Sequence, residues 1–417
     1  MMPRLPPNVT IQRRPLDTSP SARLNSYNHH ALAPWLSETG YLTPQYLFRR
    51  EKEITLFNMG RWLSPQIQER MLNPPVAIHN LSKNEVRRLL EIASETNYNT
   101  ELAEKDENLA LLAKEMETRV QGLGTNPPGG YFVRMSHCSP KDADGGNLEA
   151  VFDMHQVLVK LVVSKRTVQA LLILFYSYSA TEEVADNQLY FFPYYTGLDR
   201  LSEWRCYINN DSVVAISQSR FYQPNHPGIG DEALQSLAAQ VHQLWSDISP
   251  GLDFKSCVLD VYAEVAKPGF SVKLIEVNPW GAHLGSGSLL FHWLDDADIL
   301  EPQGLATTTV VRLVKEGESR VLTRDEAYRI GRDDIIDGEL RCLQARGLEW
   351  ILTDEKQAEF MALPLPDGHS GLTTRRDGVE LFRYHRCGTS PKPMPRDHPR
   401  FLKLQKAYKN KVGSCKV

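Results

Sequence analysis

The sequence lacks most of the features that would assign it to a specialised class of protein. Its six cysteines are scattered and form no C-x-x-C pair, which argues against a disulfide framework and against a zinc site. The formal net charge is only -4, so the chain as a whole has no general attraction for nucleic acid or anionic membranes. No apolar run is long enough to span a bilayer, and the first residues contain no apolar core of signal-peptide length. These absences predict a globular cytoplasmic protein with reduced thiols.

Familiar catalytic motifs and internal repeats are missing as well. There is neither a Walker P-loop nor a nucleophile elbow, so no reaction can be assigned from a short motif. The composition is that of an ordinary soluble protein, with 41% hydrophobic and 24% charged residues. Any site must therefore be found from residues that are unusual for their local structure.

The composition changes along the chain and predicts four regions. Residues 1–35 are rich in Pro, Ser, Arg and Asn, which is typical of a flexible arm or an extended wrap. Residues 36–125 are predicted to be helical and to end at a cluster of glycines and prolines. Residues 126–315 form the predicted core. Residues 316–417 are a C-terminal elaboration whose Lys-rich tail we interpret as a solvated helix face rather than a nucleic-acid patch.

Hydrophobic periodicity predicts an α+β fold with a largely antiparallel sheet. Ser82 and Glu85 form a capping box at the start of a helix over residues 82–93. Further helices are predicted over residues 101–120, 148–162 and 233–245. Strands are predicted over residues 131–135, 171–178, 188–195, 203–208, 212–219 and 307–313, with a hairpin over residues 258–281.

The hairpin carries acids where apolar residues are expected. Asp260 lies between Leu259 and Val261, and Glu276 and Asn278 interrupt the apolar residues of the second strand. Burying ionised carboxylates costs several kcal/mol each unless something neutralises them. A divalent cation would do so, which makes Mg²⁺ with nucleotide phosphates the first hypothesis.

The register of this hairpin follows from its turn. A three-residue loop ending at Gly269 would pair Ala266 with Phe270 and place Asp260 opposite Glu276. Directly opposed side chains share a face, and Asn278 points to that face too. Mg²⁺ prefers oxygen ligands of this kind. A solvent-facing sheet surface with chance acids is the alternative interpretation.

Four segments of the chain form a recognisable series, in the order Ser139-Pro140-Lys141-Asp142-Ala143, Glu203-Trp204-Arg205-Cys206-Tyr207, Ala215-Ile216-Ser217-Gln218, and Asp260-Val261-Tyr262 with Ile275-Glu276-Val277-Asn278-Pro279-Trp280-Gly281. In this order they resemble the cell division cycle protein 123 family, a divergent branch of the ATP-grasp superfamily. The resemblance extends over residues 131–315.

The resemblance implies an ATP-grasp fold in which two α+β lobes clasp Mg-ATP. Asp260, Glu276 and Asn278 would then hold Mg²⁺, in agreement with the hairpin geometry. Arg205 would be the catalytic residue that pairs with phosphate or a phosphorylated intermediate, although an ion pair with Glu203 is the alternative. The implied nucleotide contacts are Arg134, Lys141, Asp142, Tyr190, Phe191, Phe192 and Arg205.

Departures from the family pattern decide between functions. Glu276 stands where the family usually has Asp, the family's N-terminal aromatic segment is not recognisable in residues 1–60, and residues beyond 315 do not match. In the family these outer parts help to dock the gamma subunit of eukaryotic translation initiation factor 2. We therefore favour an ATP-dependent ligase that activates a small carboxylate as an acyl phosphate for attack by an amine. The alternatives are an ATP-binding assembly factor for initiation factor 2 and a nucleotide-binding pseudoenzyme.

Overall fold

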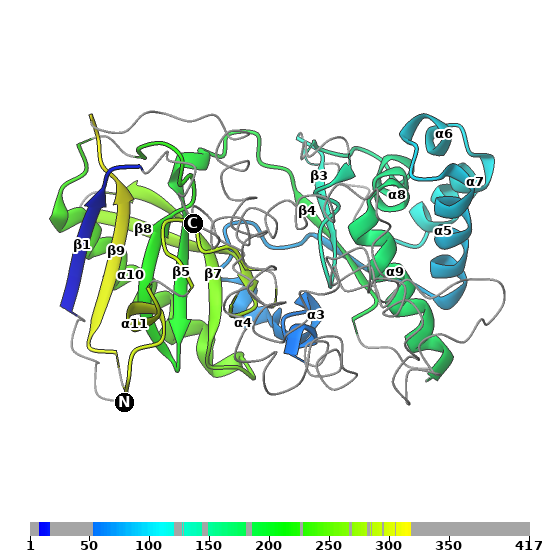
Figure 1. Cartoon of the computed structure of the whole chain (residues 1–417). Coiled ribbons are helices and arrows are strands. Elements are labelled where there is room, and N and C mark those ends of the chain that lie inside the picture. Colours follow the sequence, from blue (N-terminus) through cyan, green and yellow to red (C-terminus); the bar gives the residue numbers. More distant parts are fainter. Residues whose placement is uncertain are drawn as a thin grey trace, which may run out of the picture. The chain divides into compact units, whose positions relative to one another are not determined.

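The computed structural model describes residues 8–16, 53–120, 127, 129–143, 149–180, 186–225, 228–266, 269–281, 284, 286–293, 296–304 and 306–317. The chain divides into two compact units, one made of Met1–Ile54, Asp199–His369 and Ser390–Val417, the other of Thr55–Leu198 and Ser370–Thr389. Each unit has its own sheet with packed helices, so the predicted mixed α+β fold is confirmed (Figure 1). Within the described ranges, no helix combines the length and the apolarity needed to cross a bilayer.

The second unit is built on a small antiparallel sheet with strand order β2-β4-β3. Its strands are β2 (Ala77–Asn80), β3 (Tyr131–Met135) and β4 (Gln188–Pro193), and its helices are α3 (Met59–Trp62), α4 (Pro65–Gln68), α5 (Lys83–Thr96), α6 (Thr100–Glu104), α7 (Glu107–Glu117), α8 (Met154–Val163) and α9 (Lys165–Ala180). The predicted capping box begins α5: the Ser82 hydroxyl accepts from the Glu85 amide, and the Ser82 amide donates to the Glu85 carboxylate. Its segment Thr55–Leu198 includes part of the predicted helical region and part of the predicted core.

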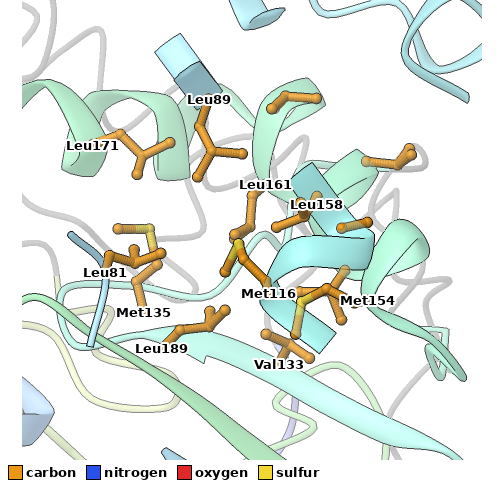
Figure 2. Packing of buried hydrophobic residues seen from close by; sticks show 14 of the residues in the cluster. Leu81, Leu89, Met116, Val133, Met135, Met154, Leu158, Leu161, Leu171 and Leu189 are labelled. Carbon is orange, nitrogen blue, oxygen red and sulfur yellow. The ribbon is translucent and has the colours of Figure 1, made fainter. Parts of the chain in front are cut away.

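Helices α5, α7, α8 and α9 pack on one face of this sheet. Figure 2 shows the resulting core, in which methionines and leucines of the helices meet Val133 and Met135 of β3 and Leu189 of β4. The opposite face of β3 and β4 carries Phe132, Arg134, Tyr190 and Phe192, because alternate residues of a strand point to opposite sides. Arg134, Tyr190 and Phe192 are themselves buried, so this second face is covered as well.

The predicted strand over residues 171–178 is wrong, because these residues belong to α9. Short apolar runs do not distinguish a buried strand from a buried helix by periodicity alone. The decisive signal lies upstream, where the Ser164 hydroxyl accepts a hydrogen bond from the Thr167 amide and so caps the helix. The predicted helix over residues 101–120 is in fact α6 and α7, since the Asp106 carboxylate accepts from the Leu109 amide and starts a new helix.

The first unit contains a six-stranded sheet with the order β1-β9-β6-β5-β7-β8. The strands are β1 (Asn8–Arg14), β5 (Glu203–Asn209), β6 (Ser212–Gln218), β7 (Cys257–Ala266), β8 (Gly269–Asn278) and β9 (Thr308–Val314). Pairs among β5 to β8 are antiparallel, whereas β9 runs parallel to both β6 and β1. Helix α10 (Asp231–Ile248) packs on one face, and the short α11 (Ala297–Leu300) packs against β6.

The predicted β7–β8 hairpin is confirmed, but its register arises differently from the prediction. Ala266 pairs with Gly269 rather than with Phe270, so the turn is one residue shorter than predicted. A β-bulge between Asp260 and Val261 then shifts the register by one residue and restores the pairing of Asp260 with Glu276. The two errors cancel, and the acids face each other as expected.

The N-terminal region also differs from its prediction. Asn8–Arg14 is a strand whose seven residues pair in parallel with β9 (Figure 1), so a flexible arm is the wrong description for this part of residues 1–35. Backbone hydrogen bonds to the neighbouring strand hold β1 in the sheet. The strand therefore does not need the long apolar stretch from which strands are predicted in a sequence. The predicted helix after Thr323 and the Lys-rich tail lie outside the described residues.

Candidate functional site

A single row of polar side chains crosses the six-stranded sheet from edge to edge. Each member lies directly opposite the next on the neighbouring strand, so all six side chains project from the same face. We call this the transverse polar row, and in sheet order it consists of Gln12, Arg312, Ser217, Arg205, Asp260 and Glu276. Polar residues in register on every strand of a sheet are unusual for the interior of a domain, since each must find a partner.

Arg205 and Asp260 form a two-pronged ion pair in the middle of this row. The Arg205 Nε donates to Asp260 Oδ1 at 2.7 Å, and Nη2 donates to Oδ2 at 2.8 Å. A third bond runs from Nη1 to the Gly287 carbonyl at 3.0 Å. The two side chains are 17% and 19% exposed, so solvent or a ligand can reach the pair. The alternative of a pair between Arg205 and Glu203 does not describe these contacts.

Asn278 joins the pair from the next strand. Its Nδ2 donates to Asp260 Oδ2 at 2.9 Å. An ionised carboxylate offers about four lone-pair directions, and these three donors occupy three of them, leaving one on Oδ1. The sheet therefore brings together Asp260, Glu276 and Asn278 as the sequence predicted, and it adds Arg205 to the same cluster.

The chemistry of this donor set suits Mg²⁺. Asp260 and Glu276 supply carboxylate oxygens, and the Asn278 amide directs its nitrogen at Asp260, which leaves its oxygen to accept a cation. Mg²⁺ sites typically use one or two carboxylates and complete their shell with water and phosphate oxygens. Within the described ranges, no cluster of three or more His, Cys, Asp and Glu side chains is arranged to hold a metal, so this mixed set is the candidate.

A loop and an aromatic cluster close the same face beside the ion pair. The Tyr207 hydroxyl donates to the Ser288 carbonyl at 2.5 Å, and its ring makes edge contacts with Phe291 and Trp293. Trp280 packs edge-on against Trp293. Burial raises the pKa of Tyr207 far above its usual range, so this hydroxyl stays protonated as a donor. The cluster fixes the loop that receives Arg205.

In the second unit, Arg134, Tyr190 and Phe192 share the face of the sheet opposite the helices, and they are buried there, at 9%, 2% and 6% exposed. Arg134 and Tyr190 are directly opposite each other on β3 and β4, and the rings of Tyr190 and Phe192 lie 6.4 Å apart. Phe132 adds a third ring, 6.2 Å from Phe192. Sequence reasoning missed Phe132, although its alternation with Arg134 carried the signal.

The side chain of Phe191 points the other way, so its implied nucleotide contact would have to come from the backbone. It is fully buried in the helix-covered core and makes an edge contact with Tyr131. Its carbonyl accepts from the Val76 amide at 2.8 Å. A run of aromatic residues in a strand divides between the two faces, so Tyr190 and Phe192 cannot share a pocket with the ring between them.

Lys141 and Asp142 are both exposed residues of a turn before α8 and α9. The Asp142 carboxylate accepts a 2.5 Å hydrogen bond from the Ser164 hydroxyl and a 3.3 Å bond from the Arg166 amide. An acid at the start of a helix satisfies its unpaired amides. Asp142 thus has a structural task at α9, and its predicted nucleotide contact receives no support from these bonds.

Sequence reasoning also missed Arg312, which is a cation within the apolar strand β9 and is 1% exposed. The signal was the one that revealed Asp260, a charge between apolar neighbours. Arg312 pairs with Asp296 from the loop over the sheet, at 2.7 and 2.8 Å.

Comparison with known proteins gives a match over most of the chain. The model of the D123 family matches residues 64–332, which include Arg205, Asp260, Glu276 and Asn278. A curated relative, cell division cycle protein 123 of Phaeosphaeria nodorum, is 25% identical over 170 residues. That alignment covers 40% of this chain and 42% of the relative, which is less than half of either protein.

Two solved structures of Cdc123 from Schizosaccharomyces pombe are also similar. The C-terminally truncated form is 16% identical and the other is 15% identical, each with a TM-score of 0.44. The similarity covers 64% of this chain and 98% of each solved chain.

Proposed function

Because the chain belongs to the D123 family, we propose that it is an ATP-binding assembly factor that holds Mg-ATP at the Arg205–Asp260–Asn278 cluster. The observation that carries the proposal is the family match over residues 64–332, which extends beyond the 131–315 resemblance on both sides and includes the whole cluster. The partner would be the gamma subunit of translation initiation factor 2, as the family resemblance implies, and the site of action the cytoplasm.

The ion pair is suited to bind the phosphates of a nucleotide. Asp260 would bind the cation through Oδ1, with Glu276 and Asn278 completing the protein's share of the shell. The cation would neutralise phosphate charge and orient the triphosphate. Arg205 holds Asp260 through Nε and Nη2, and its guanidinium would place a positive charge beside the phosphate oxygens.

The family resemblance assigns the remaining nucleotide contacts to the smaller sheet. Tyr190, Phe192 and Phe132 form a cluster of rings on one face of this sheet beside Arg134, and Tyr190 and Phe192 are buried in it. Arg134 stands where the family usually has lysine, so it would bind phosphate with a fork rather than a point charge.

The ligase is the competing function, and we rank it second. Its main support was that the family's N-terminal aromatic segment is not recognisable in residues 1–60 and that residues beyond 315 do not match. The second part weakens because the family match extends to residue 332, whereas the match begins at residue 64 and leaves the first part standing.

The first experiment measures Mg-ATP binding to the full chain by calorimetry. We expect Asp260→Ala and Asn278→Ala to lower the affinity at least about thirtyfold, equivalent to about 2 kcal/mol, without unfolding the protein. The matched control is Glu264→Gln, an exposed acid of the same strand, which should bind like the unaltered chain. Unchanged affinity in both site variants would refute the assignment of the site.

A second experiment separates assembly factor from ligase. The chain is mixed with the purified gamma subunit of initiation factor 2, and binding is measured with and without Mg-ATP. ATP-dependent capture without release of ADP supports the assembly factor. Release of ADP and phosphate only when a small carboxylate and an amine are added, with no capture of the subunit, would establish the ligase instead.

A further inference from the structure

Arg312 is bonded at every side of its guanidinium. Its Nε and Nη2 donate to Gln12 Oε1 at 3.1 and 3.0 Å, and its Nη1 and Nη2 donate to Asp296 at 2.7 and 2.8 Å. Nη1 also donates to the Leu290 carbonyl at 2.9 Å. The Phe291 ring lies 4.0 Å from the guanidinium carbon and covers it. All five N–H bonds are thereby used, so Arg312 leaves no donor for a ligand.

These bonds connect three separate parts of the chain. Gln12 lies on the N-terminal strand β1, Arg312 lies on β9, and Leu290 and Asp296 belong to the loop over the sheet. The Asp296 carboxylate also accepts from the His292 amide at 2.8 Å, so the loop is folded around the ion pair. Burial acts to raise the pKa of Asp296, but the Arg312 hydrogen bonds outweigh it and the pKa is lowered.

The same loop receives Arg205 a few residues earlier. Arg205 donates to the Gly287 carbonyl at 3.0 Å, and Arg312 donates to the Leu290 carbonyl at 2.9 Å. Between these two anchors, the Leu290 amide donates to Ser217 Oγ at 3.3 Å. Arg205, Ser217 and Arg312 are consecutive members of the transverse polar row, so the row fixes the loop at three points.

We propose that Arg312 and Gln12 are positioning residues for the candidate site, through which β1 holds the loop that orients Arg205. Gln12 fixes Arg312, Arg312 fixes the loop at Leu290, and the loop fixes Arg205 at Gly287. The N-terminal strand is therefore part of the nucleotide-binding apparatus although none of its side chains touches the site. This inference rests on the proposed ATP binding at Arg205 and Asp260.

The test replaces Gln12, because it is a partly exposed residue of an edge strand and its truncation leaves the buried ion pair in place. Gln12→Ala removes two hydrogen bonds to a charged group, and we expect a three- to tenfold loss of Mg-ATP affinity in calorimetry. Gln12→Glu, which restores an acceptor of the same length, should return the affinity to within about twofold. Thr10→Ala, on the same strand with an exposed side chain, is the matched control and should bind normally.

A double variant distinguishes positioning from general destabilisation. Arg205→Lys keeps a charge but removes the guanidinium that reaches Gly287, so Gln12→Ala should cause no further loss of affinity in that background. Equal losses from Gln12→Ala in both backgrounds would overturn the inference. So would normal affinity of Gln12→Ala.

Hydrogen exchange provides a readout that does not depend on nucleotide. The Leu290 amide donates to Ser217 of β6 and the His292 amide donates to Asp296 within the loop, and peptides spanning residues 286–293 should exchange faster in Gln12→Ala than in Thr10→Ala. Equal exchange in the two variants would overturn the inference while leaving the proposed function untouched. If the unaltered chain does not bind Mg-ATP, the proposed function fails first and the inference fails with it.

Discussion

The six-stranded sheet contains two arginine–aspartate pairs that are alike in geometry and different in surroundings. Arg205–Asp260 and Arg312–Asp296 are both two-pronged, with distances of 2.7 and 2.8 Å in each. The side chains of the first pair are 17% and 19% exposed, whereas Arg312 is 1% and Asp296 12% exposed and the guanidinium of Arg312 lies beneath an aromatic ring. The same chemical pair is a candidate binding site where a ligand can reach it and a structural clamp where the protein covers it.

The largest expected effect is a difference in the free energy of unfolding between variants of the two pairs. Arg312→Met leaves the Asp296 carboxylate without its buried partner, and we expect a loss of about 3–5 kcal/mol in the free energy of unfolding. Arg205→Met should cost no more than about 1–2 kcal/mol, because water can solvate Asp260. Urea denaturation followed by circular dichroism measures both. Equal losses in the two variants would remove the distinction between clamp and site.

Glu85, a buried acid of the second unit, predicts how the stability of the protein depends on pH. Burial acts to raise the pKa of Glu85, but hydrogen bonds from His79 and Ser82 outweigh it and lower the pKa from 4.5 to about 2. The ionised form therefore contributes stability, about 2–3 kcal/mol, that is present above pH 4.5 and is lost as the pH falls toward about 2.

The measurement is the free energy of unfolding between pH 7 and pH 2.5 for the unaltered chain and for Glu85→Gln. The variant should be less stable at pH 7 and should lose less stability on acidification, because it has no carboxyl group to protonate there. Parallel curves for the two proteins would show that the Glu85 network does not contribute. Glu91→Gln, an exposed acid on the same helix, is the control.

The smallest expected effect compares neighbouring rings on the two faces of β4. Phe191→Leu should lower the free energy of unfolding by about 1 kcal/mol and leave ATP affinity unchanged, because its ring lies in the core. Phe192→Leu should lower the free energy of unfolding by a similar amount, because its ring is 6% exposed, and should in addition weaken ATP binding by about threefold. Unchanged ATP affinity in Phe192→Leu would mean that the nucleotide does not use this face of the sheet.

The sequence predicted the arrangement of Asp260, Glu276 and Asn278 more accurately than it predicted the structure around them. An acid between apolar neighbours is a local signal, and it identified Asp260, Glu276 and Asn278 as one cluster. The bulge beside Asp260 could not be predicted, because it depends on packing between strands rather than on the turn. Its effect was to correct an error of one residue in the predicted loop.

Long-range contacts account for most of what was missed. Arg205 was expected to meet phosphate or Glu203, and only the pairing of β5 with β7 shows that its partner is Asp260. The helix α9 was read as a strand because its apolar run fits both structures. The strand β1 has no distinctive pattern of its own and exists because β9 offers an unpaired edge.

The position of β1 also has a consequence for how the protein is made. Gln12 and Arg312 are 300 positions apart in the chain. At about 5–20 residues per second, a ribosome needs roughly 15–60 s to add the segment between them. During this time β1 has been synthesised but has no strand to pair with, and β9 does not yet exist. The last step in completing the sheet is therefore the return of its first strand, and the loop over the sheet can be clamped only after that step.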